Sequence, residues 1–396
     1  MPEHVQSILT LALGGLLLVG ALVRRPVSRA ACVTVALTAL LIFAFLLPIP
    51  IGSFTMGDGT NIVERRDSFE ELVHAEREIR FSSHLAYLLL DRIDIALGST
   101  PTSPLQSYRT LSWLAGAMFA LSLVCLAGAE HWSPRAVRYI ALAILAPATL
   151  MYFGYLEVGY LALSAAAFPF VARDLHKGGD LTPGLLAGAI MYGLGAAMHG
   201  VGYLGIAGLC VAVLAADIPI RRRVLLATTL SAVAVGAALI WLWYYIAVLG
   251  LSVIPYHAIG GAIWRPVWEA REAESRIIHP LLSTITARDL FASGLVAGVS
   301  LLPVVLRISR QWSRESRVAL AFSVPCVIYF LFLWPVQGIA IEMDMVVAGF
   351  PAIYPLLWVS SHSARASLAS AGLLALGHWT FWRVVADERF INDMLR

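Results

Sequence analysis

Long apolar runs recur along the whole chain and alternate with short polar segments rich in charge, glycine and proline. Most runs approach the ~20 residues that an α-helix needs to cross the hydrocarbon core of a bilayer. We therefore predict an all-α, polytopic transmembrane bundle of about twelve spans. The expected spans are approximately residues 6–23, 30–51, 109–129, 138–153, 156–172, 182–198, 200–216, 224–250, 288–306, 317–336, 346–361 and 366–385.

Two polar segments are longer than ordinary loops, residues 52–108 and residues 251–287. In the first, residues 68–81 and residues 84–97 carry apolar side chains at helical spacing with charged residues between them. This pattern predicts two amphipathic helices that lie in the membrane interface with their apolar sides down. We expect the whole chain, 1–396, to form a single transmembrane domain without a separate soluble domain.

The basic residues predict the orientation of these spans. Every second loop of the predicted topology contains arginine or lysine, and such loops face the cytoplasm in polytopic proteins. Twelve spans with both termini outside satisfy this rule, so both long polar segments are expected on the extracytoplasmic side. The basic loops contain Arg24, Arg25, Arg29, Arg135, Arg138, Arg173, Lys177, Arg221, Arg222, Arg223, Arg307, Arg310, Arg314, Arg317 and Arg365.

Composition supports a membrane protein and argues against several other classes. Hydrophobic residues make up 59% of the 396 residues and charged residues 13%, against roughly 45–50% and about 25% in soluble domains. The net charge is only +3 and no long basic tract is present, so we expect no nucleic-acid partner. The four cysteines lie inside apolar runs without metal-ligand spacing, which favours packing roles. Protein metal ligands are not predicted.

Asp58 is the expected catalytic residue. It lies between Gly57 and Gly59, just after a predicted span and at the start of the first long outer segment. Glycine on each side allows a sharp turn and the close approach of a ligand to the carboxylate. An Asx turn at a helix end would use the same residues, and this alternative stays open from the local sequence.

Glu157 and His199 are the expected substrate-binding residues between short, tightly connected spans. Glu157 is surrounded by Tyr152, Phe153 and Tyr160, and an acidic side chain between hydrophobic spans is a candidate functional group. A surface turn would satisfy it equally well. His199 could donate to a phosphate or accept a proton, although a lone histidine between helices often serves packing.

Other polar side chains predicted on the outer face could bind an anionic or hydroxyl-bearing substrate. Cations in the second outer segment suit a phosphate, as they would suit anionic lipid headgroups. Glu342 and Asp344 lie between two late spans and point the same way only if that segment is extended; a solvated turn is the alternative. The cations are His257, Arg265, Arg271 and Arg276.

With these features placed, the chain resembles the GT-C superfamily of integral-membrane glycosyltransferases. The resemblance covers the whole length in architecture: many helices, a large first outer loop with interfacial helices, and an acid near its start. The stretches Phe153-Gly-Tyr-Leu-Glu157 and Glu342-Met-Asp344 look similar to motifs of bacterial members. Two features depart from the family pattern. Asp58 lacks the adjacent second acid that members often have, and one extra span precedes the large loop.

The resemblance implies transfer of a hexosyl or pentosyl group from a polyprenyl-phosphate donor to a hydroxyl acceptor on a lipid, glycan or protein. A carboxylate base would take the acceptor's proton, and arginine or histidine would stabilise the departing phosphate. The expected location is the bacterial cell membrane, among its lipids, with the site facing outside. No cofactor is predicted with certainty, and a divalent cation is left open because the second acid is missing.

Two other classes fit part of the pattern. A secondary transporter of a small polar or anionic solute would also have about twelve spans with polar residues among them. The charged residues, however, avoid the middles of the spans, the halves do not look alike, and the amphipathic outer loop has no evident use in a carrier. A membrane-bound acyltransferase would rest on His199 alone.

Overall fold

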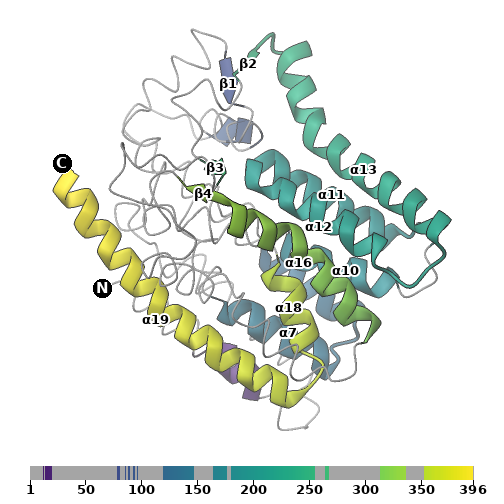
Figure 1. The fold of residues 1–396 in the computed structure, drawn as a ribbon, viewed down its shortest axis with the longest axis vertical. Helices are drawn as coiled ribbons and strands as arrows, with labels where there is room; N and C mark the ends of the chain where they lie inside the picture. The colour runs from purple at the N-terminus through teal and green to yellow at the C-terminus, as the bar shows by residue number, and fades with distance from the viewer. Residues whose placement is uncertain are drawn as a thin grey trace.

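The computed structural model describes residues 12, 14–19, 78–80, 85, 88–89, 92–93, 96, 119–146, 164–175, 180–254, 264–266, 313–335 and 352–395. Over this part the chain is mainly α-helical, as predicted, and the helices pack side by side (Figure 1). The helices are Phe119–Ala129, α7 (Pro134–Leu145), α10 (Ser164–Leu175), α11 (Pro183–Met198), α12 (Tyr203–Leu214), α13 (Ile220–Ala247), α16 (Arg314–Phe332), α18 (Ile353–Ser360) and α19 (Ala364–Leu395), with the short 3-10 turn η6 (Gly200–Gly202) between α11 and α12.

Each of these helices overlaps one of the predicted apolar runs. Residues 14–19 of the first run are also helical, whereas the runs 30–51 and 288–306 lie outside the described residues. One described helix, α13, is long and apolar enough to cross a membrane by itself, and the helices Phe119–Ala129, α11 and α12 are shorter apolar helices. The described residues therefore establish a helical bundle with one clear candidate for a membrane span.

Several helices begin at a residue that caps their free N–H groups. Ser133 accepts a hydrogen bond from the backbone N–H of Ala136, and Thr182 accepts one from Leu185. A proline follows each of these two caps, at a position where the missing N–H costs nothing. The caps place the first turns of α7 and α11 where the sequence changes from polar to apolar.

Helix α7 ends earlier than the predicted span 138–153. Its last helical residue is Leu145, and Ala146 has an extended conformation. Residue 147 is proline, which lacks the N–H that would continue the hydrogen-bonding pattern and disfavours a helical residue before it. The proline therefore ends α7 inside a run that is apolar throughout.

Small residues bring the central helices close together. A Cβ on Gly193 of α11 would lie 2.2 Å from the carbonyl oxygen of Ala234 in α13, so only glycine allows this approach. In the same way, Gly208 of α12 leaves room for Phe322 of α16. The Phe322 ring lies 5.4 Å from Tyr192 and so joins α11 to the same core. Close packing through small residues is typical of helices in membranes.

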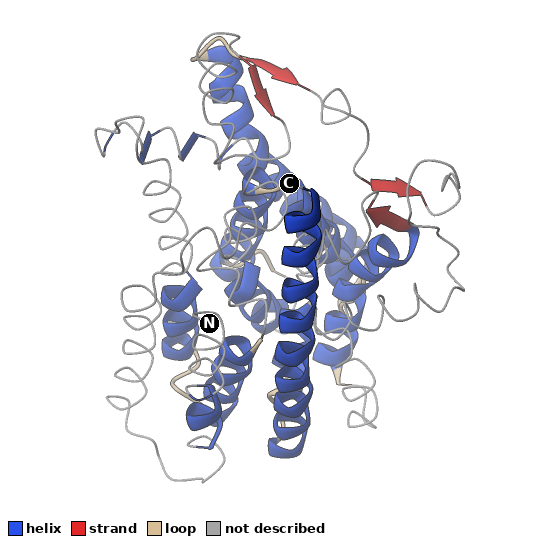
Figure 2. Ribbon diagram, turned by 90° about the vertical axis from the view of Figure 1, so that its left-hand side faces the viewer, coloured by secondary structure: helices blue, strands red, loops and turns tan. Residues whose placement is uncertain are grey.

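Four strands of three residues each form two pairs that the all-α prediction did not include. β1 (Glu78–Arg80) pairs in parallel with β2 (Ser252–Ile254), and β3 (Trp264–Pro266) pairs antiparallel with β4 (Leu333–Pro335). Figure 2 shows the two pairs as red arrows away from the main helical body. Each pair joins segments far apart in the sequence.

The first long polar segment differs in part from the prediction. Residues 78–80 of the predicted amphipathic helix 68–81 form strand β1 instead, because pairing with a distant segment overrides local helical spacing. Within the predicted helix 84–97 the described positions are helical: Leu85 and Leu88 are buried in the main core, whereas Arg92 is exposed. Its apolar side therefore packs against the protein itself, and not simply down into a lipid surface.

Candidate functional site

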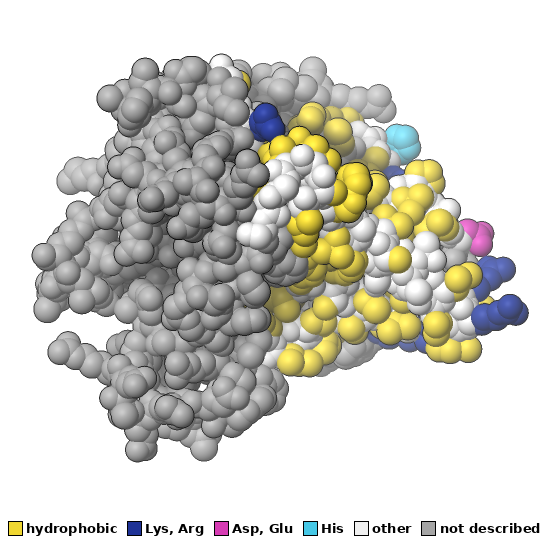
Figure 3. Space-filling model, turned by 90° about the horizontal axis from the view of Figure 1, so that it is seen from above, with side chains coloured by type: hydrophobic (Ala, Val, Ile, Leu, Met, Phe, Trp, Pro, Cys, Tyr) yellow, Lys and Arg dark blue, Asp and Glu magenta, His cyan; other side chains and the backbone are white. Residues whose placement is uncertain are grey.

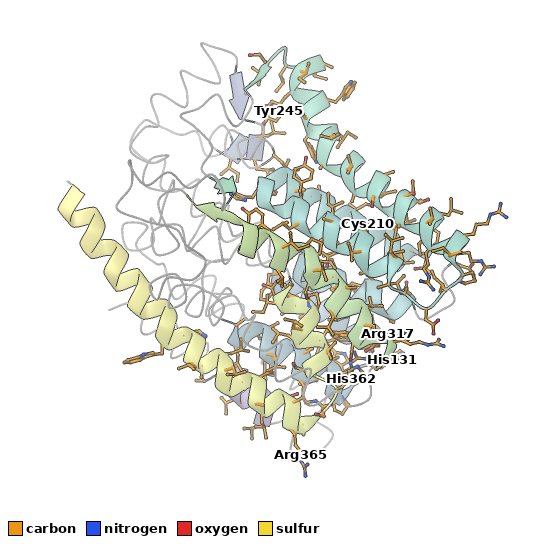
Figure 4. The ribbon with its side chains drawn as sticks, viewed as in Figure 1. His131, Cys210, Tyr245, Arg317, His362 and Arg365 are labelled. Atoms are coloured by element: carbon orange, nitrogen blue, oxygen red, sulfur yellow. The ribbon has the colours of Figure 1, made fainter. Side chains whose placement is uncertain are left out.

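The described helices run in two opposite directions, so their ends form two opposite faces of the bundle. One face, called here the arginine face, carries residues 130–138, 173–175, 180–182, 214–223, 313–317 and 361–365 at helix ends or in the turns between helices. Arg317, His131, His362 and Arg365 lie together at this end in Figure 4, and Tyr245 of α13 lies at the opposite end. Every basic loop of the predicted topology that the structure describes belongs to this one face.

An ion-pair cluster on the arginine face ties three parts of the bundle together. Both carboxylate oxygens of Glu315 accept hydrogen bonds from Arg135, at 3.2 and 2.5 Å, and Glu315 also contacts His362 Nε2 at 2.5 Å. The Arg135 guanidinium lies 3.9 Å from the centre of the Trp358 ring. The cluster therefore connects α7, α16 and the turn between α18 and α19.

Other charges on this face form smaller groups. Asp217 pairs with Arg314 at 3.0 Å and lies 3.9 Å from Arg317, so the end of α12 meets the start of α16. Asp174 is almost fully buried and accepts from Thr182 at 2.6 Å and from Arg173 at 3.1 Å. These contacts neutralise part of the positive charge and hold neighbouring helix ends in place.

The opposite face, called here the strand face, is where the two strand pairs lie. β2 follows α13 directly and β4 continues from α16, while α13 and α16 both begin on the arginine face. β1 belongs to the first long polar segment and β2 to the second, and β3 of the second segment pairs with a strand that ends seven residues before Glu342. The pair of β1 with β2 therefore joins the two long polar segments predicted to share one side of a membrane, and the pair of β3 with β4 joins the second of them to the last residues of the predicted span 317–336.

His199 is the predicted site residue that the structure describes in most detail. It ends α11, donates its backbone N–H to the Gly195 carbonyl at 3.0 Å and accepts from the Gly202 N–H at 2.8 Å. A Cβ at residue 202 would lie 2.6 Å from the Gly195 backbone, which explains why this position is glycine. The imidazole is buried with 6% exposure. The backbone of His199 therefore forms part of the turn from α11 to α12.

The other predicted site residues are placed only in part. Arg265 is the middle residue of β3 and is opposite Trp334 of β4. The remaining candidates lie outside the described residues: Asp58, Glu157, His257, Arg271, Arg276, Glu342 and Asp344. Among the described residues, no group of three or more His, Cys, Asp or Glu side chains could hold a metal ion.

Two polar features were not anticipated from the sequence. Glu315 looked like one charge in a basic loop, yet it is the acceptor that joins three helical elements. His378 is buried within α19 at 1% exposure, and its Nε2 lies 2.9 Å from the carbonyl oxygen of Leu145, the last residue of α7. Since a carbonyl only accepts, His378 donates from Nε2. Two signals were available in the sequence. His378 lies within the apolar run 366–385, and Pro147 interrupts the apolar run 138–153.

Comparison with protein-family models, with curated proteins and with solved structures found no match to this chain. In the part of the chain that the structure describes, fold and contacts define a helical bundle with a charged face, an opposite face that carries the strand pairs, and one helix long and apolar enough to span a membrane.

Proposed function

We propose that this protein is a polytopic membrane glycosyltransferase of the GT-C type. It would span the bilayer about twelve times and transfer a sugar from a polyprenyl-phosphate donor to a hydroxyl acceptor on the extracytoplasmic side. The observation that carries this proposal is the pairing of β1 with β2 and of β3 with β4. These pairs join residues of the two long polar segments to each other and to the end of α16, at the end of the bundle opposite the arginines.

Exposed apolar surface supports the membrane location. Large apolar side chains point outward along α13, and also on α16 and α19, where Ile328 is 52% exposed and Leu376 45% exposed. The apolar patches in Figure 3 lie beside dark-blue basic side chains at the edge of the molecule. Soluble monomers rarely expose contiguous apolar patches of this kind, whereas lipid chains favour them.

The arrangement of charge supports the orientation. We place the arginine face in the cytoplasm and the strand face outside, because short basic loops stay on the cytoplasmic side. A catalytic site on the strand face would then meet the headgroup of a lipid-linked donor and an acceptor from the aqueous phase.

In this proposal Asp58 is the general base that takes the proton of the acceptor hydroxyl. His199, His257, Arg265, Arg271 or Arg276 would hold the carrier phosphate, and Glu157, Glu342 and Asp344 would bind hydroxyl groups. A divalent cation is an optional addition to the donor. The secondary transporter is the rival class, since it too requires a membrane bundle with polar groups at one face.

The deciding experiment uses the purified full chain in vesicles with a polyprenyl-phosphate sugar and a range of hydroxyl acceptors. Formation of a glycosylated product supports the proposal, and Asp58→Asn should lower turnover by about 10²–10⁴-fold, the usual contribution of a general base. Asp67→Asn in the same polar segment is the matched control and should leave turnover unchanged. Movement of a solute across the membrane without any covalent product would favour the transporter.

A further inference from the structure

The outward side of α13 carries a surface whose chemistry changes from one end to the other. We propose that this surface contacts lipid and sets the depth of the protein in the bilayer, with one headgroup layer at Arg221 and Arg222 and the other at Trp243. The inference rests on the membrane location proposed above and adds to it the planes at which the chain meets lipid and water.

The outward side of α13 differs from that of a helix on the surface of a soluble protein. The inward side combines small and large buried residues: Leu226, Ala227, Leu230, Ala234, Ala238 and Tyr245. The outward side is large and apolar, where a soluble helix would be polar. Its exposed large apolar residues are Ile220, Val224, Leu225, Val235, Leu239, Ile240, Trp243 and Ile246.

The two ends of this surface match the chemistry of a bilayer. Arg221 and Arg222 are exposed at the start of α13, and cations favour the headgroup layer on the cytoplasmic side. The next charged residue after Arg223 lies beyond the end of the helix. Trp243 is 62% exposed near the other end, and tryptophan prefers the boundary between chains and headgroups.

The distance between these ends fits the hydrocarbon thickness. Residues 221 and 243 are separated along a helix by about 33 Å at 1.5 Å per residue, against roughly 30 Å for the hydrocarbon core. A modest tilt brings the two values together. A lipid bilayer is therefore the partner that fits this face in both chemistry and length.

A second exposed tryptophan provides an internal comparison. Trp379 of α19 is 60% exposed, nearly the same as Trp243. α19 also begins on the arginine face, at Ala364, and runs in the same general direction as α13 (Figure 1). Trp379 lies only about 21 Å along its helix from Arg365, at 1.5 Å per residue. The proposed planes therefore put Trp379 among the lipid chains and Trp243 at their edge.

The proposed planes also place the strand face relative to lipid. α13 ends at Ala247 and β2 begins at Ser252. The pair of β1 with β2 then lies just beyond the outer boundary of the chains, at the height of the headgroups. A donor phosphate would be held at that height.

The test compares fluorescence quenching in Trp243→Phe and Trp379→Phe with the unchanged protein, in phosphatidylcholine vesicles that carry bromine near the headgroup or deep in the acyl chains. Bromine quenches by close contact, so it acts most strongly on tryptophan near its own depth. We expect Trp243→Phe to remove signal quenched by shallow bromine, and Trp379→Phe to remove signal quenched by deep bromine. Both changes are at exposed positions and keep an aromatic ring.

The other outcomes separate the possible failures. If the two variants lose signal at the same depth, or at reversed depths, the proposed planes are wrong while the membrane location stands. If neither tryptophan is quenched at any depth, the membrane location fails together with the planes.

Discussion

Arginines on the arginine face do more than mark the predicted cytoplasmic side. Arg138 donates to the carbonyl oxygens of Ser361 and His362 at the end of α18, and Arg223 donates to those of Ile218 and Leu214 at the end of α12. Helix ends leave such carbonyls without partners. The same side chains that would set topology also complete the hydrogen bonding of neighbouring helices.

Glu315 allows a first prediction at this scale. Glu315→Gln removes the charge that Arg135 and His362 share, and the pair is largely buried, with side-chain exposures of 13% for Glu315 and 21% for Arg135. We expect unfolding to become easier by about 1–3 kcal/mol, because Arg135 keeps its charge without a carboxylate. Thermal unfolding in detergent measures this loss.

Asp217→Asn is the matched control for Glu315. Its partners Arg314 and Arg317 are exposed to 63% and 48%, so the pair should contribute less than about 1 kcal/mol. Equal destabilisation by both variants would contradict the stronger role assigned to the buried cluster.

His378 gives the second prediction. His378→Phe keeps an aromatic ring but removes the N–H that His378 donates to the Leu145 carbonyl, which should cost about 1–3 kcal/mol. His378→Gln retains an N–H that can reach the same carbonyl and should restore most of the stability. If both variants unfold at the same temperature, the hydrogen bond from His378 to the Leu145 carbonyl does not contribute to stability.

The packing of individual helices depends on where small residues lie. Gly188 of α11 leaves room for Val171 of α10, and Gly205 of α12 leaves room for Tyr192 of α11. Other glycines in the same helices are open: nothing lies within 4 Å of a Cβ built on Gly236 of α13 or on Gly372 of α19. Glycine therefore has a steric purpose at some positions in these helices and none at others.

A third prediction uses this contrast. Gly193→Ala would push α11 away from α13, because the new Cβ would lie 2.2 Å from the Ala234 carbonyl oxygen. We expect a loss of about 1–3 kcal/mol from overpacking. Gly236→Ala, on the open side of α13, should be neutral or gain up to about 1 kcal/mol in helix propensity. Comparable melting temperatures for the two variants would argue against the close crossing.

At the scale of the whole molecule, the main result is that the described helices run in two opposite directions and so separate their ends onto two faces. The basic loops of the described chain meet on one face and the strand pairs on the other, so the sequence rule and the contacts agree on which segments share an end. Ion pairs fix the first face and backbone hydrogen bonds join segments at the second. This separation is the basis of the proposed orientation.

The fourth prediction tests that orientation. Single cysteines at Ser68 and Ser313, in a background without Cys32, Cys125, Cys210 and Cys326, should react with an impermeant reagent from opposite sides of intact cells. Position 68 should be labelled from outside and position 313 only after permeabilisation. The reverse result would place the strand face in the cytoplasm and remove the proposed extracytoplasmic site.

Helix positions could be predicted from the sequence because apolar run length and the capping motifs at Ser133 and Thr182 are local signals. The early end of α7 depends on Pro147 and could have been anticipated from its chemistry. The strand pairs could not, since three residues carry little local preference and the partners lie far apart. Glu315 and His378 gain their importance from contacts with other helices, which a single sequence does not display.

For the candidate site, sequence reasoning grouped residues by predicted side, and the structure joins the segments that contain several of them. His199 was expected at a turn between spans and is found there, buried and with its backbone groups bonded within the turn. The assignment of Asp58 as base and of the cations as phosphate ligands stays a prediction, because those side chains lie outside the described residues.

The parallel pairing of Glu78–Arg80 with Ser252–Ile254 has a consequence for synthesis of the chain. The second strand leaves the ribosome about 170 residues after the first, which takes roughly 9–35 s at 5–20 residues per second. During that time β1 has no partner, and the intervening helices must insert before pairing is possible. Chains that stop before residue 252 would keep an open strand edge, and such edges are natural targets for chaperones and for aggregation.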